Sequence, residues 1–232
     1  MSYQNQCSAR VQKPRRQDEN EEKFLGSELN KVYSAADISF NRIIDARMQK
    51  RGIDLLMWVP KYDSYIFVDE KSATSHLCKE LKTFAFEISA NSNVNGSGWL
   101  FGDTKKTTAY ALVYPRADVD NVFATNSVEI IFVSRKAVLK YLNSMGIDSP
   151  QKAKSMLNGG VVLRNPDGSI YKTYVDCGNV RIVESSWLRE QPVNVLIQRN
   201  ELRQMAFLIL KGEKNNGIWS VSKRGIDFDD NN

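Results

Sequence analysis

Residues 52–71 read GIDLLMWVPKYDSYIFVDEK. Two apolar runs, 53–59 and 65–68, flank a polar segment that contains a proline, so the stretch predicts two strands joined as a hairpin. Asp54 stands at the start of the first strand, and Asp69 and Lys71 stand at the end of the second. We therefore expect two carboxylates and one ammonium group to meet at one end of a sheet.

Side-chain alternation along a strand sorts these groups by face. Asp69 and Lys71 are two residues apart and share a face, whereas Glu70 points to the other. A carboxylate beside apolar strand residues is costly unless it is paired, hydrogen-bonded or metal-bound. The grouping of Asp54 and Asp69 with Lys71 suits binding of a hard divalent cation and hydrolysis of a phosphodiester. The alternative is that Lys71 simply pairs with Asp69 at a strand edge.

The remaining apolar segments predict a sheet edged by helices. Apolar residues between 23 and 51 recur mostly at three- or four-residue steps, which predicts one or two helices, the last of which covers 38–51 and ends at Gly52. The sequence Asn165-Pro166-Asp167-Gly168 predicts the turn of a C-terminal β-hairpin. Further strands are expected at 84–88, 108–114, 128–133, 161–164, 170–175, 182–183 and 193–197, and helices at 135–145 and after Ser149-Pro150, while 199–210 fits helix or strand. We predict an α/β (α+β) fold with a mixed β-sheet flanked by helices.

Composition limits the class of protein. The chain has 232 residues, of which 42% are hydrophobic and 25% charged, which suits one globular domain. We expect a disordered polar arm at 1–22, a single domain at 23–215 and a C-terminal tail at 216–232. The formal charge of +5 fits a polyanionic partner without requiring one. No apolar run approaches the length of a membrane span, and the N-terminal residues are polar and mixed in charge, unlike a signal peptide, so we expect a cytoplasmic protein without a membrane partner.

Cysteine and histidine exclude several kinds of site. Cys7, Cys78 and Cys177 share no C-x-x-C spacing, so we expect reduced thiols instead of a disulfide framework or a zinc site. His76 is the single histidine, which excludes multi-histidine metal sites and leaves it as a bystander in our interpretation. Catalysis is therefore expected to depend on carboxylates.

These residues resemble the motif of the PD-(D/E)XK nuclease superfamily, in which an acidic residue on one strand is followed by (D/E)-x-K on the next. The match is Asp54 and then Asp69-Glu70-Lys71, within a stretch from roughly 40 to 114. Asp54 follows an isoleucine where the family's name has proline. The resemblance implies a restriction-endonuclease-like fold in which Asp54 and Asp69 bind Mg²⁺ or Mn²⁺ and Lys71 assists the attacking water.

In that superfamily the helix before the sheet often adds an acidic or polar residue to the metal site. Asp45 and Gln49 are four residues apart, on one face of the predicted helix. The resemblance therefore implies Asp45 as a further metal ligand and Gln49 as a supporting catalytic residue. The string D-x-x-x-Q-x-x-G-I-D is similar to ones in uncharacterised members from phages and mobile elements. The pentapeptide KRGID recurs at 223–227 without strands after it, so the match depends on its context.

Other segments could extend the site toward nucleic acid. Glu87 alternates with phenylalanines and either approaches the carboxylates or faces outward. The loop 91–98 with Trp99 either contacts phosphates and a base or is a loop closed by a core tryptophan. Basic residues on the same half of the chain either steer a polyanion or form a scattered charged surface: Lys105, Lys106, Arg116, Arg135, Lys136 and Lys140.

The sequence thus favours a metal-dependent nuclease that hydrolyses phosphodiester bonds, with DNA favoured over RNA. The alternative is a catalytically inactive nucleic-acid-binding or protein-interaction module on the same scaffold, in which Asp54 and Lys71 are structural. A third possibility is an oligomeric structural protein without a ligand. Duplex cutting by a single-site enzyme would favour a homodimer.

Overall fold

The computed structural model describes residues 15–60, 63–74, 77–89, 98–188 and 190–225. The helices are α1 (Arg15–Ala35), α2 (Ala46–Lys50), η3 (Val122–Ala124), α3 (Arg135–Ser144), α4 (Pro150–Leu157) and α5 (Arg199–Met205). The strands are β1 (Phe40–Arg42), β2 (Leu55–Val59), β3 (Ser64–Ser72), β4 (Thr83–Ser89), β5 (Ala109–Arg116), β6 (Ser127–Ser134), β7 (Val161–Arg164), β8 (Ile170–Cys177), β9 (Val180–Glu184), β10 (Val193–Gln198), β11 (Ala206–Asn215) and β12 (Ile218–Gly225).

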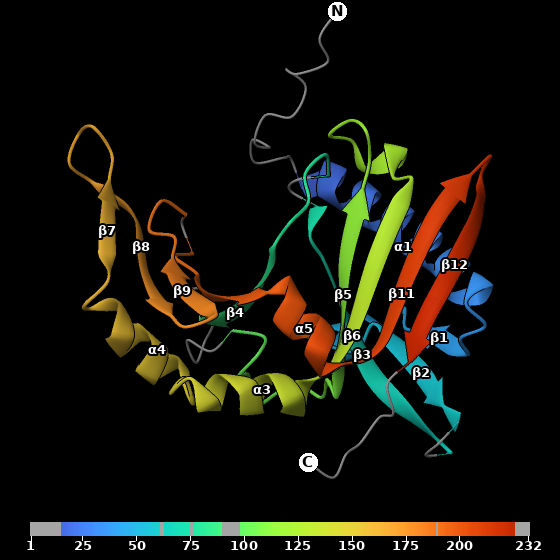
Figure 1. The fold of residues 1–232 in the computed structure, drawn as a ribbon, viewed down its shortest axis with the longest axis horizontal. Helices are drawn as coiled ribbons and strands as arrows, with labels where there is room; N and C mark the ends of the chain where they lie inside the picture. Colours follow the sequence, from blue (N-terminus) through green and yellow to red (C-terminus); the bar gives the residue numbers. More distant parts are fainter. Residues whose placement is uncertain (1–14, 61–62, 75–76, 90–97, 189, 226–232) are drawn as a thin grey trace, which may run out of the picture.

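Two sheets organise these strands. A seven-stranded sheet has the order β1-β2-β3-β5-β6-β11-β12, and its β3–β5 pair is parallel while its other pairs are antiparallel. A five-stranded antiparallel sheet has the order β4-β10-β9-β8-β7. Figure 1 shows the five-stranded sheet curling away from the larger one, with the β7–β8 hairpin at its far edge. The fold is therefore mixed α/β, with helices flanking a mixed sheet.

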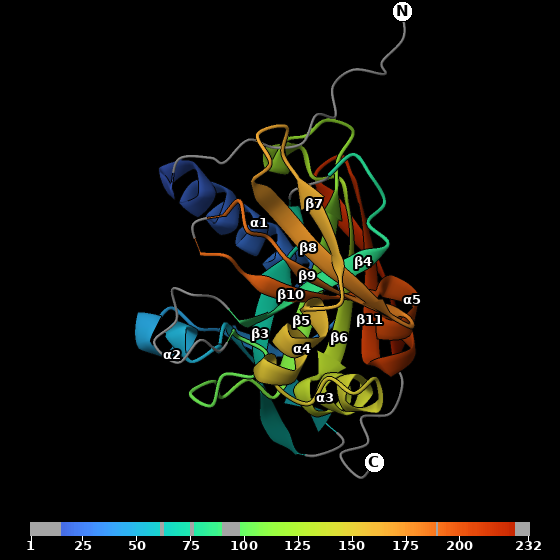
Figure 2. The same cartoon turned by 90° about the vertical axis from the view of Figure 1, so that its left-hand side faces the viewer.

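Two apolar cores lie on the two faces of the seven-stranded sheet. On one face, α1 packs through Leu25, Leu29 and Val32 against residues such as Val68 and Ala111. On the other face, β4 and β10 of the five-stranded sheet pack with α3 and α4 against β5 and β6. Strands β5 and β6 are buried along almost their whole length because both of their faces are covered. Figure 2 shows α1 to one side, with the β7–β8 hairpin at the front.

The hairpins predicted at 53–68 and 161–175 are confirmed as β2–β3 and β7–β8. Of the one or two helices predicted over 23–51, the part at 23–35 is confirmed as helix within α1. The part at 38–51 is wrong as a continuous helix, because it forms strand β1 and the short helix α2. Phe40 and Arg42 pair with β2, and the periodic apolar positions include Ile44, which is 92% exposed. Backbone pairing with β2 outweighs the helical spacing of these side chains.

The ends of the domain also differ from the sequence-based boundaries. Helix α1 begins at Arg15, within the segment assigned to a polar arm, while residues 1–14 lie outside the described residues. Strand β12 occupies much of the segment assigned to a tail and pairs with β11. Residues 199–210, which fit helix or strand, are divided between α5 and β11.

The cysteines depart in part from the expected reduced state. Cys177 is a free thiol, whereas Cys78 is disulfide-bonded, which corrects the expectation for that residue. No helix among the described residues is long and apolar enough to cross a membrane.

Candidate functional site

Gly52 turns the chain from α2 into β2 and thereby sets the position of Asp54. Its φ of +76° lies in the left-handed region, which glycine adopts without steric cost. A Cβ at this position would lie 2.3 Å from Thr107 Oγ1 and 3.3 Å from Asp69 Oδ2. Thr107 also donates its hydroxyl to the Gly52 carbonyl at 2.8 Å. The absence of a side chain therefore lets the segment before β5 and the Asp69 carboxylate approach the turn.

Asp54 lies at the entrance to β2 and is held against β3. Its backbone N–H donates to the Val68 carbonyl at 2.9 Å, and its Oδ2 accepts from the Glu70 N–H at 2.9 Å. Burial, the charge of Asp69 and a hydrogen bond with the Asp69 side chain raise the pKa of Asp54 to about 7, against smaller opposing effects of Lys71 and the Glu70 N–H. Two carboxyl groups this close favour a shared proton or a shared cation.

Asp69 and Lys71 form the other half of the cluster. Asp69 is only 1% exposed, and Lys71 Nζ donates to its Oδ1 at 2.6 Å. Asp69 Oδ2 is buried and has no hydrogen-bond partner among the described residues when both carboxylates are ionised. The Lys71 ammonium also lies 5.4 Å from the centre of the Trp99 ring, which packs against Phe86 and Tyr110. Lys71 is thus held between a carboxylate and an aromatic ring.

Glu70 points away from this pair, as side-chain alternation predicts. It accepts a hydrogen bond from Tyr33 Oη at 2.6 Å and a short one from Arg42 Nη1. Burial and the charge of Glu70 raise the pKa of Tyr33 well above its usual value, so the phenol remains a donor. Glu70 therefore joins α1 and β1 to the strand that carries Asp69 and Lys71. Sequence reasoning missed Tyr33 and Arg42, because nothing local to them indicates a partner on β3.

A cleft of about 780 Å³ opens between α1 and this end of the sheet. Asp54, Glu70 and Lys71 line it from the sheet, together with Arg42. Its wall on α1 includes acidic residues that the sequence analysis assigned to the polar arm, namely Glu19, Glu21 and Glu22. No group of three or more histidine, cysteine, aspartate or glutamate side chains is arranged to hold a metal within the described residues. The carboxylate pair of Asp54 and Asp69 is therefore the metal-binding candidate.

The two residues expected from the preceding helix have different positions. Gln49 lines the same cleft as Asp54, although its amide nitrogen donates to the Ile43 carbonyl at 3.0 Å. Asp45 is the N-cap of α2, where it accepts from the Arg47 N–H at 2.7 Å and pairs with the Arg47 guanidinium. This cap explains Asp45 structurally, and the arrangement does not bring it into the wall of the cleft. Its role as a metal ligand stays a prediction.

Basic side chains border the turn at Gly52. Lys105 Nζ donates to the Lys50 carbonyl at 2.9 Å, and the Lys106 N–H donates to the Arg51 carbonyl at 2.8 Å. These contacts join two basic segments, 50–51 and 105–106, next to the carboxylate pair. Lys50, Arg51 and Lys106 are exposed, so a polyanion approaching Asp54 meets positive charge there.

The loop residues named as candidates are placed only in part. Residues 90–97 and His76 lie outside the described residues. Trp99 is packed in the core beside Lys71, so it serves as a wall of the carboxylate cluster. Glu87 lies on β4 in the five-stranded sheet between two core residues, Phe86 and Ile88, so alternation turns its side chain away from that core.

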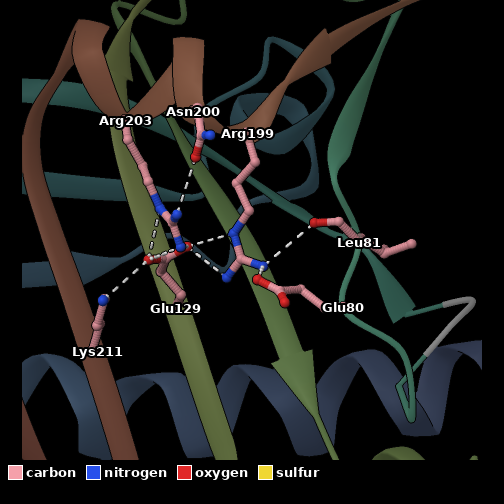
Figure 3. Close-up of polar contacts among 7 residues, drawn as sticks. All are labelled: Glu80, Leu81, Glu129, Arg199, Asn200, Arg203 and Lys211. Carbon is pink, nitrogen blue, oxygen red and sulfur yellow. Dashed lines mark hydrogen bonds and ion pairs between the residues drawn. The ribbon is translucent and has the colours of Figure 1, made fainter.

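A second cluster of buried charge lies at the start of α5 (Figure 3). Glu129 on β6 is 6% exposed and accepts from Arg199 Nε at 2.6 Å and from Arg203 Nη2 at 2.9 Å. The Arg199 guanidinium lies 4.3 Å from the centre of the Tyr114 ring and reaches the Leu81 carbonyl. Because its carboxylate is fully engaged by cations, this cluster joins the two sheets and is not a reactive site.

The chain matches no family model, no curated protein and no solved structure in the comparisons with known proteins.

Proposed function

We propose that the chain is a metal-dependent nuclease that hydrolyses phosphodiester bonds of nucleic acid, with DNA as the favoured substrate, on a restriction-endonuclease-like fold. One observation carries this proposal: Asp54 and Asp69 lie side by side on neighbouring strands, and Lys71 donates to Asp69 at 2.6 Å. The parallel β3–β5 pair and the covering helix α1 support the fold assignment.

The residues fit a hard divalent cation such as Mg²⁺ or Mn²⁺. Apart from a protonated Asp54 carboxyl, the buried Asp69 Oδ2 has no hydrogen-bond donor among the described residues, and burial and the charge of Asp69 raise the pKa of Asp54 to about 7. A cation bound to both groups would relieve their repulsion and use carboxylate oxygens, the ligands that these metals prefer. When bound, it would neutralise charge on the phosphate and lower the pKa of an attacking water.

The protein's own groups have separate roles in this proposal. Asp54 and Asp69 would hold the cation, and the contacts of Lys71 with Asp69 and with the Trp99 ring fix the direction of its ammonium group. Lys71 orients the nucleophilic water and stabilises the negative charge that develops on the phosphate. Gln49 supports the site from the cleft wall. The exposed basic segments at 50–51 and 105–106 attract the phosphate backbone.

The proposal is tested by cleavage of labelled plasmid, linear duplex, single-stranded DNA and RNA in Mn²⁺, Mg²⁺ or EDTA. We expect metal-dependent cutting by the wild type and a rate lower by about a hundredfold or more in Asp54→Asn and Lys71→Ala, by analogy with the loss of one group that stabilises charge in a transition state. Asp176→Asn is the matched control, because Asp176 is exposed and pairs with Arg181 on the five-stranded sheet.

Cutting that survives in both variants would contradict the assigned site. No cutting of any substrate, together with no Mn²⁺ binding in calorimetry, would favour the catalytically inactive binding module. In that case the Lys71–Asp69 ion pair is structural. A homodimer for duplex cutting stays a prediction, which sedimentation of the DNA complex would test.

A further inference from the structure

An exposed apolar surface adjoins the carboxylate pair on the same face of the sheet. Ile66 and Val68 of β3 face the core under α1, so Tyr65 and Phe67 face the opposite side, which Asp69 and Lys71 share. Tyr65 is 46% exposed and Phe67 is 37% exposed. Two exposed aromatic rings therefore lie on the same face of β3 as the candidate catalytic groups and precede them along the strand.

Strand β2 widens this surface. In the antiparallel register Trp58 lies opposite Tyr65 and Leu56 lies opposite Phe67. The Trp58 and Tyr65 rings are 5.0 Å apart in an edge-to-face arrangement. We call Leu56, Trp58, Tyr65 and Phe67 the aromatic platform. Figure 1 shows the β2–β3 hairpin extending past the region where the five-stranded sheet packs on the larger one, which explains why the platform is uncovered.

A basic cleft borders the platform. It has a volume of about 1150 Å³, and Tyr65, Phe101, Arg135, Lys136 and Lys140 contribute to its lining. Asp103 and Asp148 also line it, so three cations face two carboxylates. Arg135 is held in place by carbonyl groups of Leu100 and Gly102, whereas Lys140 is exposed on α3. The cleft therefore offers an anion a net positive wall next to exposed aromatic rings.

We propose that the aromatic platform and this cleft bind single-stranded nucleic acid, with unpaired bases stacked on Tyr65 and Phe67 and phosphates facing Lys140. Only unpaired bases offer their faces to a side chain, whereas duplex bases stack on one another. The inference rests on the proposed function and deepens it, because Tyr65 and Phe67 precede Asp69 and Lys71 on the same face of β3. It assigns the substrate as nucleic acid with a single-stranded segment beside the cut.

The test is equilibrium binding in EDTA, where no cleavage occurs, measured by fluorescence anisotropy. The probes are labelled (dT)20, labelled (U)20 and a blunt DNA duplex. We expect (dT)20 affinity to fall about fivefold to a hundredfold in Tyr65→Ala and in Phe67→Ala, the effect of losing one stacked base. Tyr65→Phe keeps the ring and should bind as the wild type does. Trp187→Ala is the matched control, since Trp187 is 60% exposed but lies in the five-stranded sheet region.

The salt dependence of binding tests the contribution of the cleft separately from that of the aromatic rings. Lys140→Ala should lower the slope of log affinity against log salt for (dT)20 by roughly 0.7 per lost phosphate contact. A comparison of (dT)20 with (U)20 decides whether DNA or RNA is preferred on the same platform. Thermal unfolding of each variant checks that the exposed substitutions leave the fold intact.

The experiments can contradict the proposed role of the aromatic platform and the proposed nuclease activity independently of each other. Loss of (dT)20 binding in the ring-deleting variants supports the platform even if no substrate is cut. The platform is overturned if the wild type does not bind single strands, or if Tyr65→Ala and Phe67→Ala bind (dT)20 as tightly as the wild type. It is also overturned if the variants lose duplex and single-strand affinity equally.

Discussion

Asp54 is partly buried next to Asp69, and its pKa of about 7 lies well above the ordinary value of an aspartate. In the unfolded chain the same group ionises near pH 4. Ionisation therefore disfavours the folded protein, and this unfavourable contribution grows as pH rises from about 4 to about 7. In the metal-free protein the surroundings of Asp54 disfavour its ionised form. Carboxyl groups with a raised pKa of this kind are common at functional sites.

Asp54→Asn should therefore stabilise the metal-free protein while removing its proposed activity. The asparagine oxygen can still accept from the Glu70 N–H, and its amide can donate toward Asp69. We expect a gain of about 1 to 2 kcal/mol at pH 8, which corresponds to a few degrees in melting temperature. The gain should shrink as pH falls toward 4. Calorimetric unfolding in EDTA at the two pH values measures it.

Asp176→Asn serves again as the control, because Asp176 is exposed on the five-stranded sheet and should change the melting temperature little. Addition of Mn²⁺ should raise the melting temperature of the wild type more than that of Asp54→Asn. A destabilised Asp54→Asn protein at pH 8 would show that the carboxylate is structurally required.

At the scale of elements, buried charge joins β6, α5 and the segment before β4. Glu129 is surrounded by Arg199 and Arg203, with Lys211 at 4.0 Å. Removing the carboxylate would leave buried cations without their partner, which costs more than the pair contributes when intact. This asymmetry makes the junction between the two sheets sensitive to a single substitution.

Glu129→Gln should lower the free energy of unfolding by about 3 to 5 kcal/mol, measured by urea denaturation. Arg199→Ala should cost more than Arg203→Ala, because the Arg199 side chain is 9% exposed and the Arg203 side chain is 33% exposed. Equal effects of the two arginine variants would contradict the burial argument. An unchanged Glu129→Gln protein would show that the cluster contributes no net stability.

Local patterns predicted some elements and failed at others. The β2–β3 hairpin, with Asp69 and Lys71 on one face and Glu70 on the other, follows from alternation and from a proline turn. The helix over 38–51 failed because β1 gains a partner in β2 that no local spacing reveals. The acidic wall from α1 was missed for the same reason, since its charge balance is typical of a solvated arm. Contacts distant in sequence decided each of these cases.

At the scale of the whole molecule, helix α1 near the N-terminus contacts the C-terminal strands β11 and β12. Glu28 on α1 accepts from Trp219 Nε1 at 2.9 Å and pairs with Lys214 at 2.6 Å. Burial raises the pKa of Glu28, but hydrogen bonds from Lys214, Lys31 and Trp219 outweigh it and lower the pKa to about 2. The stabilisation is therefore complete above about pH 4.5 and is lost as pH falls toward 2.

Glu28→Gln should lower the free energy of unfolding by about 2 to 3 kcal/mol at pH 7, and the difference from the wild type should vanish toward pH 2. Urea denaturation across this pH range measures the effect. Glu213→Gln is the matched control, because Glu213 is exposed on β11 near the same junction. A Glu28→Gln effect that persists unchanged at pH 2 would contradict the lowered pKa.

The pairing of β4 with β10 also constrains how the protein is made. Strand β4 ends at residue 89, while its partner begins at residue 193, so a chain growing on the ribosome carries β4 unpaired until residues 193–198 have emerged. The core between the two sheets closes only then, and it contains Trp99, the ring beside Lys71. A nascent chain therefore lacks the finished wall of the carboxylate cluster. Synthesis itself would delay the proposed cutting activity until translation is nearly complete.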